Sequence, residues 1–231
     1  MDYTIRYENN KAVGTAYVVL TGTGSKYTGS IRVAFKITGT NMSKVKVTGV
    51  DTKGNEYTGS PVELMKMTKL TITDNEKNLA TEDYTVSYQK NLKKGTAIMV
   101  LTGIPERGYS GSKKVTFKIN AKPVEKLQVE LKDSKNVNGT WIAPYMKGGS
   151  KPEVVVTDGE KELVLGKEYI VSYKKNKKVG ETATLTIKGK GNYGKTTSLE
   201  FMVVQKDVAI YQNSVSINAL DKEYSNKQFT S

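Results

Sequence analysis

The chain has 231 residues, and its 36 lysines and arginines against 23 aspartates and glutamates give a formal net charge of +13. It contains no histidine and no cysteine, which excludes Ser-His-Asp and Cys-His nucleophiles, His/Cys zinc sites, iron–sulfur clusters and disulfides. Hydrophobic residues make up 37% of the chain, which is enough for a folded core. The longest apolar runs, such as 16–20, fall far short of the roughly 18 residues that a membrane helix needs, so no membrane insertion is expected.

Lysine dominates the positive charge, because the only arginines are Arg6, Arg32 and Arg107. Proteins that read a nucleic-acid sequence depend on arginine for bidentate contacts, so no specific nucleic-acid partner is expected. The densest run, 174–178, falls between two strand patterns and is predicted to be a solvated turn. The functional alternative is loose, salt-dependent attraction to a cell-wall polyanion or a glycan.

The chain repeats one segment, which reads DYTIRYENN at 2–10, DYTVSYQKN at 83–91 and EYIVSYKKN at 168–176. Each copy is followed at the same spacing by a glycine, then by a Thr/Ala-rich stretch, a tyrosine-containing turn and an alternating stretch centred on phenylalanine. The glycines are Gly14, Gly95 and Gly180, and the phenylalanines are Phe35, Phe117 and Phe201. Chance does not produce so many matches in one order, so the sequence indicates a tandem repeat.

Apolar and polar residues alternate along all the stretches of each copy. In the first stretch of the middle copy, Tyr84, Val86 and Tyr88 share one face, while Thr85 and Ser87 take the other. A period of two, in segments rich in Val, Ile, Thr and Tyr, predicts half-buried antiparallel strands. The predicted inward positions of the other two stretches are Ala97, Met99, Leu101, Val115, Phe117 and Ile119, with equivalents in the other copies.

A more variable half precedes the second and the third copy. It contains Val45 and Val47 in one case and Val154–Val156 in the other, with turns at 73–77 and 157–161. Short strands separated by turns every 8–12 residues or so are typical of two sheets packed face to face. The sequence therefore predicts an all-β fold of tandem Ig-like antiparallel β-sandwiches.

The repeat spacing divides the chain into complete and partial units. Residues 40–121 and 122–205 are the complete Ig-like repeats, 1–39 are the C-terminal half of a repeat, and 206–231 start a further one. We therefore expect the sequence to be a piece of a longer array. The apolar face of residues 1–39 would then lack a partner sheet, and would either pack on residues 40–121 or take the C-terminal strand of another molecule, head to tail.

Several of these motifs together resemble the MBG/YDG-type bacterial Ig-like repeat. They are DYTVSY at 83–88 with Asn91 and Gly95, the turn Tyr109-Ser-Gly111, and GKGNY at 189–193. The resemblance covers nearly the whole chain, although 57–60 and 145–148 match the signature of the first half only loosely. It implies a secreted or wall-attached protein of Gram-positive bacteria, a spacer or adhesive role, and no shared catalytic residues.

Carboxylates are the acid–base groups left for catalysis when histidine and cysteine are absent. Asp83 and Glu168 recur at the start of equivalent strands, so we interpret them as turn residues. The acidic segments 74–76 and 158–160 are too short for a calcium-binding loop and are predicted to be hairpin turns. Lysine–asparagine crosslinks are not expected, because strand lysines such as Lys36 take outward positions. We expect no catalytic residue, no metal site and no cofactor.

The stretch 136–149 is the most individual part of the chain and holds the only tryptophan, Trp141. Aromatic side chains on a loop make good anchors for sugars or proteins, so Trp141 and Tyr145 are the candidate binding residues. The alternative, which we favour, is that Trp141 fills the core of its sandwich.

The sequence favours a non-catalytic spacer, or stalk, or an adhesive segment of a bacterial cell-surface or secreted protein. The resemblance implies an extracellular location, at the cell surface or in the cell wall. We expect a monomer within a longer array. One alternative is a module that binds a host protein, for example an immunoglobulin, or a glycan; another is an accessory module of a secreted carbohydrate-active enzyme.

Overall fold

The computed structural model describes residues 2–67 and 69–206, and 53% of the structure is β-strand, with almost no helix. The prediction of an all-β fold is therefore confirmed. The chain divides into two compact units, Met1–Lys122 with Gly191–Tyr193, and Pro123–Lys190 with Gly194–Ser231. The predicted start of a further repeat at 206–231 lies outside the described residues, apart from Lys206.

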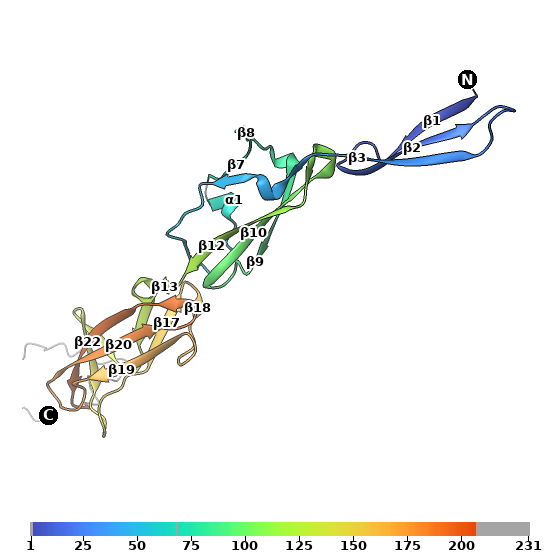
Figure 1. Ribbon diagram of the computed structural model, residues 1–231. Coiled ribbons are helices and arrows are strands. Elements are labelled where there is room, and N and C mark those ends of the chain that lie inside the picture. The colour runs from blue at the N-terminus through green and yellow to red at the C-terminus, as the bar shows by residue number, and fades with distance from the viewer. Residues whose placement is uncertain (1, 68, 207–231) are drawn as a thin grey trace, which may run out of the picture. The chain divides into compact units, whose positions relative to one another are not determined.

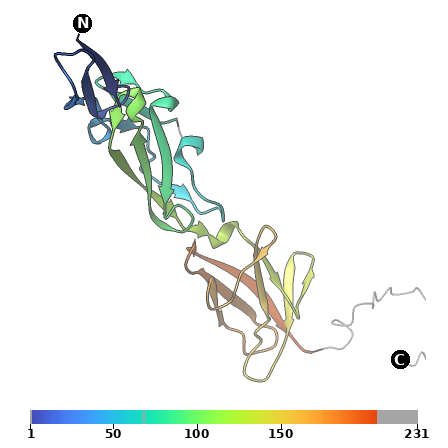
Figure 2. The ribbon, with the colours of Figure 1, turned by 90° about the vertical axis from the view of Figure 1, so that its right-hand side faces the viewer.

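The same three-stranded antiparallel meander occurs at each copy of the repeat (Figure 1). The meanders are β1 (Tyr3–Glu8), β2 (Gly14–Gly22) and β3 (Ser30–Ile37); β9 (Tyr84–Gln89), β10 (Gly95–Gly103) and β12 (Ser112–Asn120); and β19 (Tyr169–Lys174), β20 (Thr182–Gly189) and β22 (Thr196–Val204). Figures 1 and 2 show the green strands β9, β10 and β12 side by side, in agreement with their pairing.

The strand register is equivalent in the three meanders. The recurring phenylalanine stands opposite an alanine in each of them, and the pairs are Ala16 with Phe35, Ala97 with Phe117, and Ala183 with Phe201. The turn after the first strand is equivalent too, since φ is 55° at Asn9, 56° at Lys90 and 52° at Lys175. The recurring glycine that follows also has a positive φ in each copy, a conformation that favours glycine over other residues. The repeat seen in the sequence is thus a repeat of backbone structure.

A second, smaller sheet is formed by the residues that precede each of the last two meanders. Its strands are β5 (Lys46–Thr48), β7 (Thr71–Asp74) and β8 (Lys77–Asn78) in one case, and β14 (Gln128–Leu131), β17 (Val154–Asp158) and β18 (Lys161–Glu162) in the other. Antiparallel pairing of β7 with β8 and of β17 with β18 confirms that the acidic segments 74–76 and 158–160 are hairpin turns. We call residues 40–83 and 122–168 the covering halves of β9–β10–β12 and β19–β20–β22.

Each covering half also adds a strand to the sheet of its meander. β6 (Asn55–Glu56) pairs in parallel with β12. β16 (Thr140–Pro144) pairs in parallel with β22 on one side and antiparallel with β15 (Lys135–Val137) on the other. The prediction of purely antiparallel sheets is therefore wrong at these two edges. Alternation along a strand shows which side chains share a face but carries no information about the direction of the neighbouring strand.

The segments that lead into the two covering halves, 39–43 and 121–125, are anchored to the fold. They contain β4 (Thr40–Asn41), which pairs in parallel with β11 (Tyr109–Ser110), and β13 (Lys122–Pro123). The short helices η1 (Met42–Lys44) and η4 (Val124–Lys126) follow, and Met42 and Val124 are buried. The remaining elements are α1 (Leu64–Met67), η2 (Thr81–Asp83), η3 (Pro105–Arg107) and β21 (Tyr193–Gly194).

Most of the predicted inward positions form the core of the two covered meanders, whereas Val86 on β9 is 37% exposed. Phe117 and Phe201 are buried, and each forms a T-shaped pair with a tyrosine ring. The centroids of Tyr88 and Phe117 lie 6.4 Å apart at an interplanar angle of 90°, and those of Tyr173 and Phe201 lie 6.3 Å apart at 83°. This T-shaped arrangement is one that aromatic pairs prefer.

Candidate functional site

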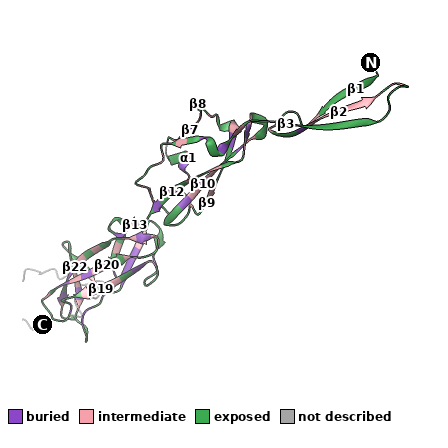
Figure 3. Ribbon diagram, in the orientation of Figure 1, coloured by how far each residue is buried: buried purple, intermediate pink, exposed green. Residues whose placement is uncertain are grey.

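The apolar face of β1–β3 departs from the burial seen in the other two meanders (Figure 3). This face is formed by the predicted inward residues Tyr3, Ile5, Tyr7, Val18, Leu20, Val33 and Phe35, and by Ile31, which the repeat pattern did not include. Its members on β1 and β3 are exposed, from 38% at Phe35 to 60% at Ile31. The face therefore does not pack on residues 40–121, one of the two arrangements left open by the sequence. Contiguous exposed apolar surface of this kind marks an interaction surface.

An open pocket of about 520 Å³ lies at one end of this apolar face. Tyr3, Tyr27 and Ile31 are among the side chains that line it, and all three are exposed. In the second meander the tyrosine equivalent to Tyr27 is Tyr109, which is buried. The pocket is therefore part of the same uncovered surface.

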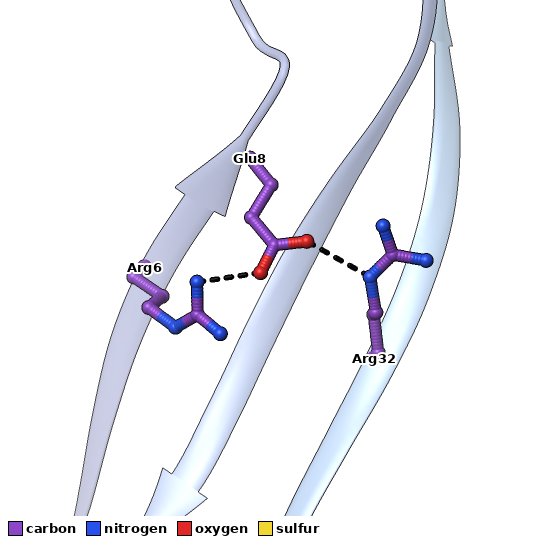
Figure 4. A network of polar contacts seen from close by, with 3 residues as sticks. All are labelled: Arg6, Glu8 and Arg32. Atoms are coloured by element: carbon purple, nitrogen blue, oxygen red, sulfur yellow. Dashed lines mark hydrogen bonds and ion pairs between the residues drawn. The ribbon is translucent and has the colours of Figure 1, made fainter.

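The opposite face of β1–β3 carries a polar network (Figure 4). Glu8 accepts a hydrogen bond from Nε of Arg32 at 2.9 Å, and its other carboxylate oxygen pairs with Nη1 of Arg6 at 2.5 Å. The guanidinium carbon of Arg32 lies 3.1 Å from the centre of the Tyr17 ring on β2. Because β2 separates β1 from β3 in the sheet, Glu8 and Arg32 connect the two outer strands across it.

The charges of this network stabilise one another. The hydrogen bond from Arg32, with a smaller contribution from Arg6, holds the pKa of the Glu8 carboxyl group below its ordinary value. Glu8 in turn raises the pKa of Arg32. Since these side chains are accessible to water, screening keeps their contribution to stability small. The geometry is that of an ion-pair network that links strands.

The structure places the two candidate binding residues at different depths. Trp141 lies on β16, stands opposite Phe201 in the parallel pairing, and is half-buried. Tyr145 follows the end of β16, is 42% exposed, and donates its N–H to the carbonyl oxygen of Val204 at 2.7 Å. Trp141 therefore lies on a paired strand and not on a loop, because 140–144 pairs with strands on both sides.

Neither candidate ring takes part in an aromatic pair among the described residues. The two rings therefore do not stack on each other, and because Trp141 is half-buried its side chain is not fully enclosed in a core. A binding role for these two residues stays a prediction.

A recurring asparagine fastens each covering half to its meander, a contact that the sequence reasoning missed. Asn176 donates from Nδ2 to the carbonyl oxygen of Ser150 at 2.7 Å, and the N–H of Ser150 donates back to the carbonyl oxygen of Asn176 at 2.7 Å. Asn91 forms the same two bonds with Val62, at 3.1 and 2.7 Å. We call this pair of bonds the asparagine clamp. The signal was present in the sequence, because asparagine ends every copy of the repeated segment, including Asn10.

The recurring acidic residues at the start of the meanders bind backbone groups. Asp83 accepts a hydrogen bond from the N–H of Ala80 at 2.9 Å, and Glu168 accepts one from the N–H of Val164 at 2.9 Å. Glu168 also pairs with Nζ of Lys161 at 2.6 Å. These carboxylates shape the turns ahead of the first strands, as predicted from their position in the repeat.

Glu168 makes the stability of its unit depend on pH. Partial burial raises the pKa of its carboxyl group, but the hydrogen bonds from Lys161 and Val164 outweigh this effect, so the pKa is lowered. A carboxylate whose pKa is lower in the folded protein adds stability above its unfolded pKa, near about 4.3, and loses it as pH falls through the folded value. We expect the free energy of unfolding to fall with acidification from about pH 5. Glu168→Gln should lower the free energy of unfolding by about 1–2 kcal/mol at pH 7. It should also make that free energy depend less on pH in the acid range, below about pH 5.

Denaturant unfolding at a series of pH values, with hydrogen exchange read on β19 and β20, measures this effect. Glu153→Gln is the matched control, because Glu153 pairs with Lys132 through a side chain that is 62% exposed. That change should alter stability by less than about 0.5 kcal/mol. If the Glu168→Gln variant loses stability with acidification as steeply as the unmodified chain, the Glu168 carboxylate is not the source of this pH dependence.

The lysine-rich segment 174–178 surrounds the buried Asn176 with exposed lysines, which confirms the predicted solvated turn. Lys36 and Lys118 are exposed as well, as their outward strand positions predict. Within residues 2–67 and 69–206, no group of three or more acidic side chains could hold a metal ion. In the same part of the chain, no helix has the length and apolar character needed to cross a membrane.

Comparison with known proteins found no match to this chain among protein families, curated proteins or solved structures. A function for the chain therefore has to be argued from its own residues and from the family that its motifs resemble.

Proposed function

We propose that the chain is a tandem array of Ig-like β-sandwiches that serves as a non-catalytic stalk or adhesive segment of a bacterial cell-surface or secreted protein. One observation carries the proposal: a meander with the same register, the same tyrosine–phenylalanine pair and the same asparagine clamp occurs in both covered repeats. Repetition of one structural unit extends a molecule, whereas an enzyme depends on a site that is built once.

Two sheets in each covered repeat support the Ig-like description. Tyr169 on β19 donates its hydroxyl to the carbonyl oxygen of Val154 on β17 at 2.6 Å, which places the two sheets in direct contact. Val154 and Val156 on one sheet, and Leu185 on the other, are buried. Alternate strand positions that bury aliphatic side chains between two sheets are the hallmark of a sandwich core.

The surface and the junctions suit a stalk. Met42 and Val124 are buried where each covering half begins, which anchors the chain at the points where a flexible linker would otherwise run. The formal net charge of +13 is spread over exposed lysines and would attract an anionic cell wall in a salt-dependent manner. The proposed extracellular location follows from the family resemblance.

A binding module is the second candidate, and it is favoured by the half-buried Trp141 on β16 and the exposed Tyr145 just after the end of that strand. Aromatic side chains that are partly exposed on a rigid strand are good anchors for a host protein or a glycan. This candidate differs from the stalk in one measurable respect, namely saturable binding that survives salt.

Binding measurements on the full chain separate the two candidates. For a stalk we expect only weak attraction to anionic wall polysaccharides and mucins, which disappears at about 0.5 M salt because it is electrostatic. Serum proteins, immunoglobulin included, should show no saturable binding. Surface plasmon resonance at low and high salt makes the measurement, with Trp141→Ala and Lys151→Ala as a matched pair. Saturable, salt-resistant binding that Trp141→Ala abolishes without lowering the melting temperature would replace the stalk by the binding module.

A further inference from the structure

The two covered meanders show what the uncovered one needs. We propose that the apolar face of β1–β3 is an interaction surface for a covering half of the same type as residues 40–83 and 122–168. This inference goes beyond the proposed function, because it assigns a surface and an occupant and holds whether the array is a stalk or a binder.

Equivalent residues of the three meanders differ in how far they are buried. Phe35 is 38% exposed, whereas its equivalents Phe117 and Phe201 are 4% and 0% exposed. Tyr3 is 44% exposed, whereas Tyr84 and Tyr169 are 6% and 2% exposed. The residue types, the strand register and the T-shaped ring pair, at 6.3 Å between Tyr7 and Phe35, match those of the covered meanders. The difference is therefore the covering half and not the meander itself.

In the covered meanders, tyrosine hydroxyl groups form hydrogen bonds with backbone groups of the covering halves. The Tyr173 hydroxyl donates to the carbonyl oxygen of Pro152 at 2.5 Å. The Tyr88 hydroxyl accepts a hydrogen bond from the N–H of Met65 at 3.1 Å. Their equivalent is Tyr7, which is exposed. A covering half would thus bring polar partners for this face as well as apolar ones.

The asparagine clamp occurs in the two covered repeats, and its asparagine is also present after β1. Asn91 and Asn176 each exchange two hydrogen bonds with one residue of a covering half. Asn10 occupies the same place after β1 and is exposed. An asparagine at this position has a role in both covered repeats, and the same role is available to Asn10 when a covering half is present.

The outer edge of the third strand of each covered meander pairs with a strand of the covering half. β12 and β22 receive the parallel strands β6 and β16 from their covering halves. β3 is the equivalent strand, and it lies at the edge of a sheet whose order is β1–β2–β3. A covering half would therefore pair with the outer edge of β3 near Phe35 while its other strands cover the apolar face.

Other occupants fit less of this pattern. A second copy of β1–β3 offers apolar side chains for the face, but it contains no segment equivalent to Val62 or Ser150, the residues with which the asparagine clamp forms. The segment 206–231 of a second copy matches only the start of a covering half by its sequence, with Val215 and Ile217 in place of Val45 and Val47. Both remain outcomes of the test.

Grafting supplies the proposed occupant to the full chain. Residues 122–167 are placed directly ahead of Asp2, since Asp2 is the equivalent of Glu168. We expect amide exchange in β1–β3 to slow by at least about tenfold, because these strands would share a closed core. Binding of the dye ANS to the chain should fall. A second graft, with residues 40–82 in the same place, guards against a mismatch between one covering half and this meander.

Two controls make the result specific. A graft that carries lysine at the positions of Val154 and Val156 should leave the exchange of β1–β3 unchanged, because charged side chains cannot cover the face. Asn10→Ala should speed amide exchange of β1–β3 in the grafted chain and have no effect in the ungrafted one. Non-specific apolar contact with the graft would not make exchange depend on Asn10. If neither unmodified graft protects β1–β3, the proposal is overturned. It is equally overturned if the ungrafted chain dimerises in analytical ultracentrifugation with β1–β3 already protected, since a second copy would then be the occupant.

Discussion

Replacing Phe117 with alanine will lower the free energy of unfolding of its repeat by about 3–5 kcal/mol. Phe117 is 4% exposed and forms a T-shaped pair with the Tyr88 ring, so its removal leaves a cavity and also breaks an aromatic pair. Because the chain forms two compact units, a single global transition is not assumed. Denaturant unfolding with hydrogen exchange read on β10 and β12 measures the loss locally.

Phe35→Ala is the matched control for this change. The same side chain in the same register is 38% exposed on β3, so its removal should cost about 1 kcal/mol or less. Equal losses for Phe35→Ala and Phe117→Ala would mean that the apolar face of β1–β3 is covered in solution by another molecule. The pair of variants therefore tests the burial difference on which the covering-half proposal depends.

Asn176→Ala will lower the free energy of unfolding of the last repeat by about 2–3 kcal/mol. Asn176 is 6% exposed, and its loss leaves the carbonyl oxygen of Ser150 without its side-chain donor in a buried place. Asn176→Asp should be at least as damaging, because it places a carboxylate oxygen against that carbonyl oxygen. Thermal unfolding of the full chain, with exchange read on β19 and on 150–156, gives the measurement.

Asn91→Ala and Asn10→Ala complete the comparison. Asn91 forms the same clamp with Val62 and should show a loss of the same sign, whereas Asn10 is exposed and should show a change within about 0.5 kcal/mol. If Asn176→Ala were as mild as Asn10→Ala, the clamp would not be what holds a covering half to its meander.

The strands of the meanders could be predicted because their signal is local. Alternation of the kind seen at Tyr84, Val86 and Tyr88 is a direct consequence of the pleat, and three copies of one pattern in one chain reinforce one another. The acidic turns ahead of Tyr84 and Tyr169 could be predicted for the same reason. Their residues interact with neighbours close by in the sequence.

The parts that escaped prediction depend on residues far apart in the chain. The parallel pairing of β16 with β22 joins Trp141 to Phe201, so the tryptophan lies on a strand and not on the loop that its own segment suggests. The clamp between Asn176 and Ser150 cannot be seen locally either, because an asparagine between lysines, with a glycine four residues later, is also an ordinary turn sequence. In both cases a distant segment gives the residue its environment.

The sequence by itself determined which side chains share a face, since a period of two assigns every residue of a strand to one side or the other. It thereby placed Phe35, Phe117 and Phe201 at one position of one repeat. Only the tertiary structure decided that two of these rings are buried and one is exposed. The reason is physical: pleating is a property of a few consecutive residues, whereas burial requires a second sheet, and that sheet comes from a covering half elsewhere in the chain.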